Sequence, residues 1–242
     1  MRRKDRLTLS LAILLSILLS LSYSDAEARK IKTQFWFNYA LKAPINQKIS
    51  LGGDIGSRGL ISNPHWNQFL VRPTLTYKFT DKLSLSGAVA WFGTYFNEQN
   101  SLQEYRLHQG VTFKAPDLGI IGFFYRFRIE ERFFFLSDNS GNTFNVRIRG
   151  LIGVNTKDIT WLGSKRPIFL QSMVEGFQTI DKNATNELFV NQTRVHLAIG
   201  HKISKQFRYE FHYIAQRSRV FNEEGDRAAQ NVLRLRLFHR LN

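Results

Sequence analysis

Residues 123–135 read FFYRFRIEERFFF, and they separate into two chemically distinct sets when every second residue is taken. One set is largely ionic and consists of Phe124, Arg126, Arg128, Glu130, Arg132 and Phe134. The other is largely aromatic and consists of Phe123, Tyr125, Phe127, Ile129, Glu131, Phe133 and Phe135. Successive side chains of a β-strand point to opposite faces, whereas helical spacing would scatter the arginines around the axis. The segment therefore predicts a strand with one charged face and one aromatic face.

A water-soluble sheet normally buries its apolar face and exposes its polar face to solvent. Here both faces are extreme, which is typical of a lipid-spanning barrel strand with apolar residues outside and polar residues inside. Ten further segments fit the same two-residue period to varying degrees. They are residues 34–41, 48–58, 68–79, 83–91, 104–113, 144–154, 168–177, 192–200, 207–218 and 232–241. We therefore expect an all-β fold, a single antiparallel transmembrane β-barrel.

The number of segments bears on how the barrel closes. Eleven are counted, but single-chain bacterial barrels normally have an even number of strands. Either one strand is missed, with residues 158–165 as the candidate, or two of the segments form one strand. The expectation is ten or twelve strands. The connections alternate between short, turn-like segments and longer ones, as the short periplasmic turns and long outer loops of such barrels do.

The first residues carry an export signal. Arg2, Arg3, Lys4 and Arg6 precede an apolar run from Leu7 to Leu21, and Ala26-Glu27-Ala28 has the small-x-small pattern of a cleavage site. We expect residues 1–28 to be a cleaved signal peptide and residues 29–242 to be one barrel domain in a bacterial outer membrane. The alternative, an uncleaved membrane anchor, requires a longer apolar run.

The composition limits the chemistry. The chain has 242 residues, a formal net charge of +15, 21 phenylalanines and no cysteine. Disulfides, thiol nucleophiles and thiolate metal sites are therefore excluded. The mean hydropathy of −0.27 resembles that of a soluble protein, but lumenal polar residues lower this average in a membrane barrel as well.

The charged faces would line the lumen, because a lysine or arginine facing lipid at mid-bilayer costs about 2–4 kcal/mol. Two interpretations stay open. Arginine–glutamate ladders could fill a narrow lumen, since barrels of about eight strands are filled and those of about sixteen leave a channel. Alternatively, the basic lumen could bind or conduct small anions, which the planar guanidinium suits. The lumen-lining candidates are Arg106, Arg126, Arg128, Glu130, Arg132, Arg147, Arg149, Arg194, Arg208, Glu210, Arg234 and Arg236.

Two alternatives of other classes remain. A lipid-active, phospholipase-like enzyme would need a serine, a histidine and a polar orienting residue on the outer surface. His108, His196 and His212 fall on predicted lumenal faces, His65 falls in a loop, and His201 and His239 would face outward or lie at the interface. With no catalytic arrangement found, we expect no enzyme activity. A soluble periplasmic β-sandwich would instead bury all aromatic faces in one core.

Cofactor and metal motifs are missing from the sequence. It has no HExxH pattern, no cysteine–histidine cluster and no glycine-rich phosphate loop. We therefore expect no cofactor and no metal. The basic residues alternate with lipid-type aromatics and form no exposed patch, which argues against nucleic acid as a partner.

Several motifs, taken in order, resemble those of a bacterial outer-membrane barrel family, that of domain of unknown function 2490. They are Gln34-Phe35-Trp36, residues 72–78 (RPTLTYK), residues 83–87 (LSLSG), residues 126–133 (RFRIEERF), Arg147-Ile148-Arg149 and residues 191–194 (NQTR). The resemblance covers nearly the whole mature chain. It implies an outer-membrane barrel, with membrane lipid and the barrel assembly machinery as partners, and it implies no established activity. Outer-membrane barrels usually end in an aromatic residue, and here Phe238 lies near the end.

Overall fold

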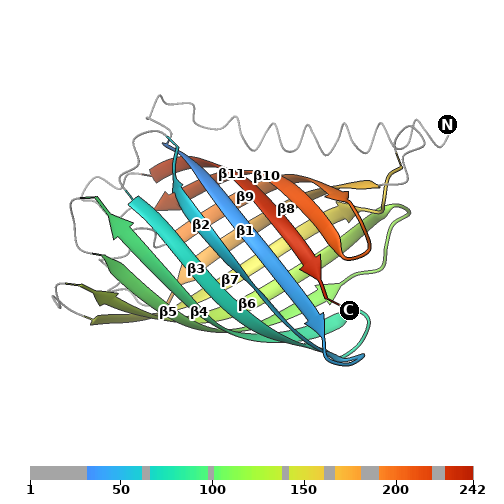
Figure 1. The fold of residues 1–242 in the computed structure, drawn as a ribbon, viewed down its shortest axis with the longest axis horizontal. Coiled ribbons are helices and arrows are strands. Elements are labelled where there is room, and N and C mark those ends of the chain that lie inside the picture. Colours follow the sequence, from blue (N-terminus) through green and yellow to red (C-terminus); the bar gives the residue numbers. More distant parts are fainter. Residues whose placement is uncertain are drawn as a thin grey trace. The chain divides into compact units, whose positions relative to one another are not determined.

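The computed structural model describes residues 32–61, 66–97, 101–137, 142–160, 167–180, 191–219 and 227–241. The predicted signal peptide lies outside these residues. The described residues form eleven strands that hydrogen-bond into one closed barrel (Figure 1). The strands are β1 (Lys32–Pro44), β2 (Ile49–Leu60), β3 (Trp66–Lys78), β4 (Leu83–Phe96), β5 (Leu102–Lys114), β6 (Ile121–Leu136), β7 (Asn142–Thr156), β8 (Ile168–Thr179), β9 (Asn191–Lys202), β10 (Phe207–Arg219) and β11 (Arg227–Arg240). No helix in this part of the chain is long and apolar enough to cross a membrane.

The closure of the barrel departs from a purely antiparallel arrangement. The eleven described strands fall between the ten and twelve that the sequence led us to expect, and β1 pairs with β11 in parallel. When an odd number of strands run alternately up and down, the first and last point the same way and can pair only in parallel. Residues 161–166 of the suspected extra strand lie outside the described residues. Ile159 in the same segment forms a single bridge with Ile168.

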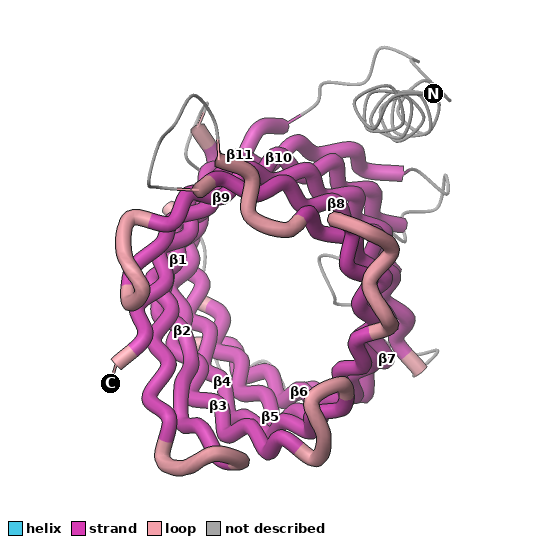
Figure 2. Tube along the Cα trace, turned by 90° about the vertical axis from the view of Figure 1, so that its right-hand side faces the viewer, coloured by secondary structure: helices cyan, strands magenta, loops and turns pink. Residues whose placement is uncertain are grey.

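The two faces of each strand separate as their alternation predicts. On β6, Glu130 is 1% exposed inside the barrel, and Phe127 is 47% exposed on its outer face. Outward aromatic pairs join neighbouring strands, such as Tyr105 with Phe135 at 5.7 Å between ring centroids. The charged side chains therefore lie on the inner side of the strands and the exposed apolar ones on the outer side. Figure 2 shows the strands arranged as a closed ring.

Three tight turns at one end of the barrel share a local design. Asn46 accepts hydrogen bonds from the backbone N–H groups of residues 48 and 49, both at 2.8 Å. Thr80 and Ser204 do the same for the backbone two and three residues further on. Asparagine, threonine and serine side chains favour turns because they can satisfy the backbone locally. These turns define what we call the short-turn end of the barrel.

Pro73 lies inside β3, where a residue without an N–H group would disrupt the hydrogen-bond ladder. The β3–β4 register has no pair at residues 72 and 73, and Pro73 lies opposite Gly53 of β2. Gly53 has a φ of +142°, and a Cβ atom there would lie 2.3 Å from the carbonyl oxygen of Arg72. The glycine thus allows the backbone of β2 to approach β3 beside the proline.

Candidate functional site

Two connected cavities occupy the barrel interior. The central cavity has a volume of about 380 Å³ and is lined by twelve arginines: Arg58, Arg72, Arg106, Arg126, Arg128, Arg132, Arg147, Arg149, Arg194, Arg208, Arg234 and Arg236. The second, which we call the vestibule, has a volume of about 1190 Å³ and reaches the turn at residues 203–206. Arg72, Arg126, Arg128, Arg208 and Arg236 line both cavities, so the two are contiguous.

The twelve lumen-lining candidates from the sequence all lie inside the barrel. Eleven line the central cavity, and Glu130 is buried against the arginines around it. Arg58 and Arg72 were not among those candidates, although both lie on predicted strands. β2 contains Gly52, Gly53, Gly56 and Gly59, which weaken the two-residue pattern that would have marked its inner face.

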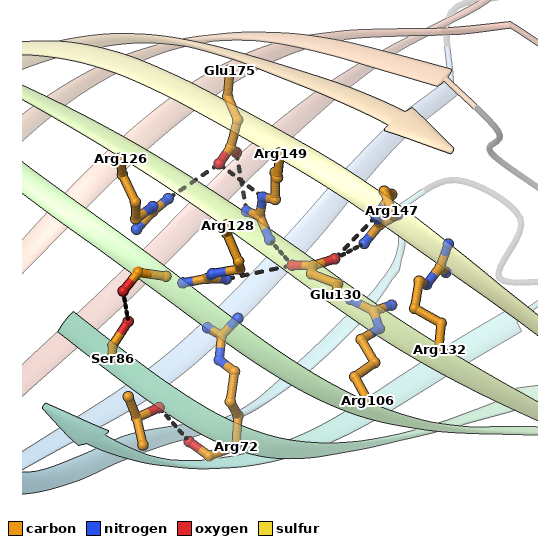
Figure 3. Close-up of polar contacts among 12 residues, drawn as sticks. Arg72, Ser86, Arg106, Arg126, Arg128, Glu130, Arg132, Arg147, Arg149 and Glu175 are labelled. Carbon is orange, nitrogen blue, oxygen red and sulfur yellow. Dashed lines mark hydrogen bonds and ion pairs between the residues drawn. The ribbon is translucent and has the colours of Figure 1, made fainter. Parts of the chain in front are cut away.

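Glu130 is the centre of the first ion-pair network, which lies on the wall formed by β5–β8 (Figure 3). Arg147 donates to its carboxylate from Nε at 3.0 Å and Nη2 at 2.5 Å, and Arg149 donates from Nη1 at 2.9 Å. Arg128 adds an ion pair at 3.5 Å. One buried carboxylate thus faces three guanidinium groups.

Arg149 joins this network to a second carboxylate, Glu175 of β8. Its Nε and Nη2 atoms donate to Glu175 at 2.9 and 3.1 Å, while its Nη1 atom contacts Glu130. Arg126 also donates to Glu175, at 3.1 Å. Nearer the other end of the barrel, Glu104 accepts hydrogen bonds from Arg106 and from Arg132, the latter at 2.6 Å. The arginines of this wall are therefore held by carboxylates.

Two smaller groups lie elsewhere in the lumen. Arg72 donates to Asp54 from Nε at 2.8 Å and from Nη2 at 2.9 Å. Arg234 donates to Nδ1 of His212 at 2.9 Å, and Nε2 of His212 lies 3.0 Å from a carboxylate oxygen of Glu210. A guanidinium can only donate, so Nδ1 accepts and the proton of the neutral ring lies on Nε2 and points to Glu210. His212 therefore separates Arg234 from the nearest acid.

The seam where β1 meets β11 and β2 has a different character. Trp36 of β1 is opposite Arg234 on one side and Arg58 on the other. The guanidinium carbons of Arg58 and Arg194 lie 4.3 and 5.1 Å from the centre of the Trp36 ring. In the described part of the chain, neither arginine has a carboxylate within ion-pair distance. Both bond instead to neutral glutamines.

Apart from Phe134, which falls in the ionic set of residues 123–135, the inward aromatic rings were not anticipated from the sequence, which assigned aromatic residues mainly to the outer face. Trp36, Phe92, Phe134 and Phe177 point inward and contact guanidinium groups, with Arg106 lying 3.7 Å from the ring centre of Phe92. A guanidinium stacks favourably on an aromatic face. Their positions in the two-residue alternation could have revealed this, because each of these aromatic residues falls on the same face as the arginines of its own strand or of the neighbouring strand.

The histidines are distributed as follows. His108, His196 and His212 are buried inside the barrel. His201 and His239 lie near the short-turn end and bond to the hydroxyl groups of Tyr209 and Tyr39, at 3.1 and 2.7 Å. His65 lies outside the described residues. Within those residues, no group of three or more His, Asp or Glu side chains could hold a metal ion.

The chain matches the model of a known protein family. The model of a family described as "Protein of unknown function (DUF2490)" matches residues 33–229, which include almost every residue of the barrel from β1 to the start of β11. A search of curated proteins found no match.

Proposed function

Since the chain belongs to the DUF2490 family and folds as a closed barrel, we propose that it is a bacterial outer-membrane β-barrel whose arginine-rich lumen admits and conducts small anions. The observation that carries the proposal is the charge balance of the lumen. In the described part of the chain, twelve arginines line the central cavity, and five carboxylates are buried among them: Asp54, Glu104, Glu130, Glu175 and Glu210. Positively charged walls around a pore favour anions.

The outer surface supports the membrane location. Large apolar side chains are exposed all around the barrel, and Phe35, Leu75, Phe127, Phe211 and Leu233 are each at least 45% exposed. Soluble monomers rarely expose contiguous apolar patches larger than a few hundred Å². The closed barrel, with its ionic interior, also excludes the sandwich alternative, because the aromatic faces point outward and form no common core.

The vestibule supports entry of anions from the short-turn end, which would face the periplasm. Beyond the shared arginines, it is lined by Lys42, Lys114, Lys202 and Arg240, with Asp158 as the only acid near the rim among its described lining residues. Clefts lined by one sign of charge raise the local concentration of the opposite ion. A wide basic vestibule that leads into a narrower arginine-lined cavity would act as such a funnel.

The structural interpretation is the second candidate, and a specific observation favours it: the β5–β8 wall is closely cross-linked by arginine–carboxylate pairs. On this alternative, the lumen is a filled ionic core that conducts nothing. The lipid-active enzyme is the third class, and the tyrosine partners of His201 and His239 do not supply the serine that it requires.

The test is planar-bilayer recording of the refolded protein under a salt gradient. Arg236 lines both cavities and has no carboxylate within ion-pair distance in the described part of the chain. We expect wild-type steps with a reversal potential on the chloride side. Arg236→Glu should shift that potential towards zero or the cation side, while Lys48→Glu, the same charge change in an exposed turn, should leave it unchanged.

Each other outcome decides against the proposal. A folded barrel that gives no steps would mean a filled lumen and a structural role. Steps without anion preference, or an equal shift in Lys48→Glu and Arg236→Glu, would remove the lumenal arginines as the selective element. Folding is checked independently by the slower migration of the protein after boiling, and lipid hydrolysis is assayed on the same preparation.

A further inference from the structure

The arginines of the seam differ from those of the β5–β8 wall in what satisfies their hydrogen bonds. Arg194 donates to Oε1 of Gln216 at 2.7 Å and to Oε1 of Gln192 at 2.8 Å. Arg58 donates to Oε1 of Gln68 at 3.1 Å. Neutral amides position a guanidinium without forming an ion pair with it. Glu175 lies opposite Arg194 in the β8–β9 register, but it makes no ion pair with Arg194 within the described residues.

The aromatic rings at the seam fix the orientation of both groups. Arg58 lies over Trp36, and Arg194 lies over Trp36 and over Phe177, the latter at 4.5 Å. Trp36 is itself 3% exposed and is anchored by a hydrogen bond from Nε1 to Gln34 at 2.7 Å. Because rings cover their faces, the guanidiniums can accept a further partner only at their in-plane N–H edges, the geometry that suits carboxylate and phosphate oxygens.

Donors at the seam remain unused. The Nε atoms of Arg58 and Arg234 are buried and have no hydrogen-bond partner among the described residues. Neither ring nitrogen of His196 is hydrogen-bonded there either, and one of the two is a donor in the neutral ring; its Nε2 lies 3.8 Å from a carboxylate oxygen of Glu175. Of the charged groups around Arg58, Arg194 repels it most strongly. Buried polar groups in native proteins are normally satisfied, so a cluster of unused donors with like charge points to a missing acceptor.

We propose that Arg58 and Arg194, assisted by Arg234, form a binding site for the oxyanion group of a small molecule, a carboxylate or a phosphate. The inference rests on the proposed anion-accepting lumen and adds a resident site and a ligand class to it. The central cavity of about 380 Å³ lies at the lower end of small-molecule pockets. It would accept a compact di- or tricarboxylic acid or a small phosphate, and the barrel wall separates it from lipid headgroups.

Binding is tested on the full-length barrel in a neutral, phosphate-free detergent. Citrate and inorganic phosphate are titrated separately by calorimetry, with chloride at equal ionic strength as the reference. The location is read from Trp36 fluorescence in a variant that carries Trp66→Phe, Trp91→Phe and Trp161→Phe. We expect saturable binding of at least one oxyanion with a change in Trp36 emission, and the tighter of the two identifies the ligand class.

Two variants test which arginines are responsible. Arg58→Gln and Arg194→Gln should each weaken binding roughly ten-fold or more, because each removes hydrogen bonds from a charged donor. Lys48→Gln makes the same charge change in an exposed turn that lines neither cavity. Its affinity should stay within about three-fold of the wild type.

The site is refuted if folded protein binds neither oxyanion more tightly than chloride, or if Arg58→Gln and Arg194→Gln bind as the wild type does. Equal weakening in Lys48→Gln would show diffuse electrostatics and no defined site. Anion-selective conductance without binding at Trp36 would refute only this inference. Binding at Trp36 in a barrel that gives no steps would refute conduction and leave the site.

Discussion

Replacing Glu130 by glutamine should destabilise the barrel strongly, because Glu130 is the most heavily shared carboxylate of the β5–β8 wall. It is 1% exposed and meets Arg147 through two hydrogen bonds, Arg149 through a third, and Arg128 through an ion pair at 3.5 Å. Glutamine keeps the shape of the side chain but removes the charge. Three guanidiniums would then share a site from which the balancing charge is gone.

The magnitude follows from this geometry. A hydrogen bond to a charged group is worth about 1.5–3 kcal/mol, and three are weakened or lost. Arg149 keeps its contacts with Glu175, and Arg128 and Arg147 line the central cavity, which limits their desolvation, so the sum of the three is an upper limit. Removing one partner of a buried ion pair costs about 3–5 kcal/mol, which we expect as the loss in free energy of unfolding.

The assay is reversible urea unfolding of the refolded protein in lipid vesicles, followed by tryptophan fluorescence. Glu131 provides a matched control, because it is the next residue of β6 and its side chain points to the outer face, opposite Leu107 and Val146. Glu131→Gln should leave stability unchanged or raise it, since it removes a charge from an apolar surface. A loss below about 1 kcal/mol for Glu130→Gln, or an equal loss for both variants, would contradict the ion-pair network as a stabilising element.

Two further predictions concern glycines of the barrel wall. Gly53→Ala should cost about 1–3 kcal/mol in the same unfolding assay, since an alanine there would have a strained φ and a Cβ atom 2.3 Å from the carbonyl oxygen of Arg72. Gly200→Ala should cost about 1–3 kcal/mol, because its Cβ would lie 2.1 Å from the ring of Phe169. Gly176→Ala, where nothing lies within 4 Å of the new methyl group, is the control for both and should be near neutral; a comparable loss there would show that the clashes are not the cause.

The strands were predictable because alternation is a local property. Residues 123–135 were assigned from their own pattern, and β6 extends from Ile121 to Leu136. All eleven segments proposed from the sequence correspond to strands in this way. Each strand has an apolar outer face and a more polar inner face, so its alternating sequence is enough to identify it as a strand.

The closure and the pairing of the charges were not predictable in the same way. A strand that pairs in parallel shows the same alternation as one that pairs antiparallel, so nothing local marks β1 and β11 as parallel neighbours. Likewise, Arg149 contacts Glu130 and Glu175 because β7 lies between β6 and β8 in a particular register. Register depends on the whole sheet, and a single strand does not specify it.

The separation of the lumen into two walls also explains how one arginine-rich interior could serve both stability and binding. On the β5–β8 wall, each guanidinium is paired with a buried carboxylate, and several also contact aromatic rings, so removing an acid there leaves buried charge unbalanced. At the seam, glutamines and aromatic rings hold Arg58 and Arg194 in place without neutralising them. Removing Arg58 therefore relieves like-charge repulsion instead of creating it, because the charges that act on it most strongly are other arginines. If the two walls were one network, Arg58→Gln would lower stability as Glu130→Gln does; if they are separate, it should weaken oxyanion binding while stability stays equal or rises.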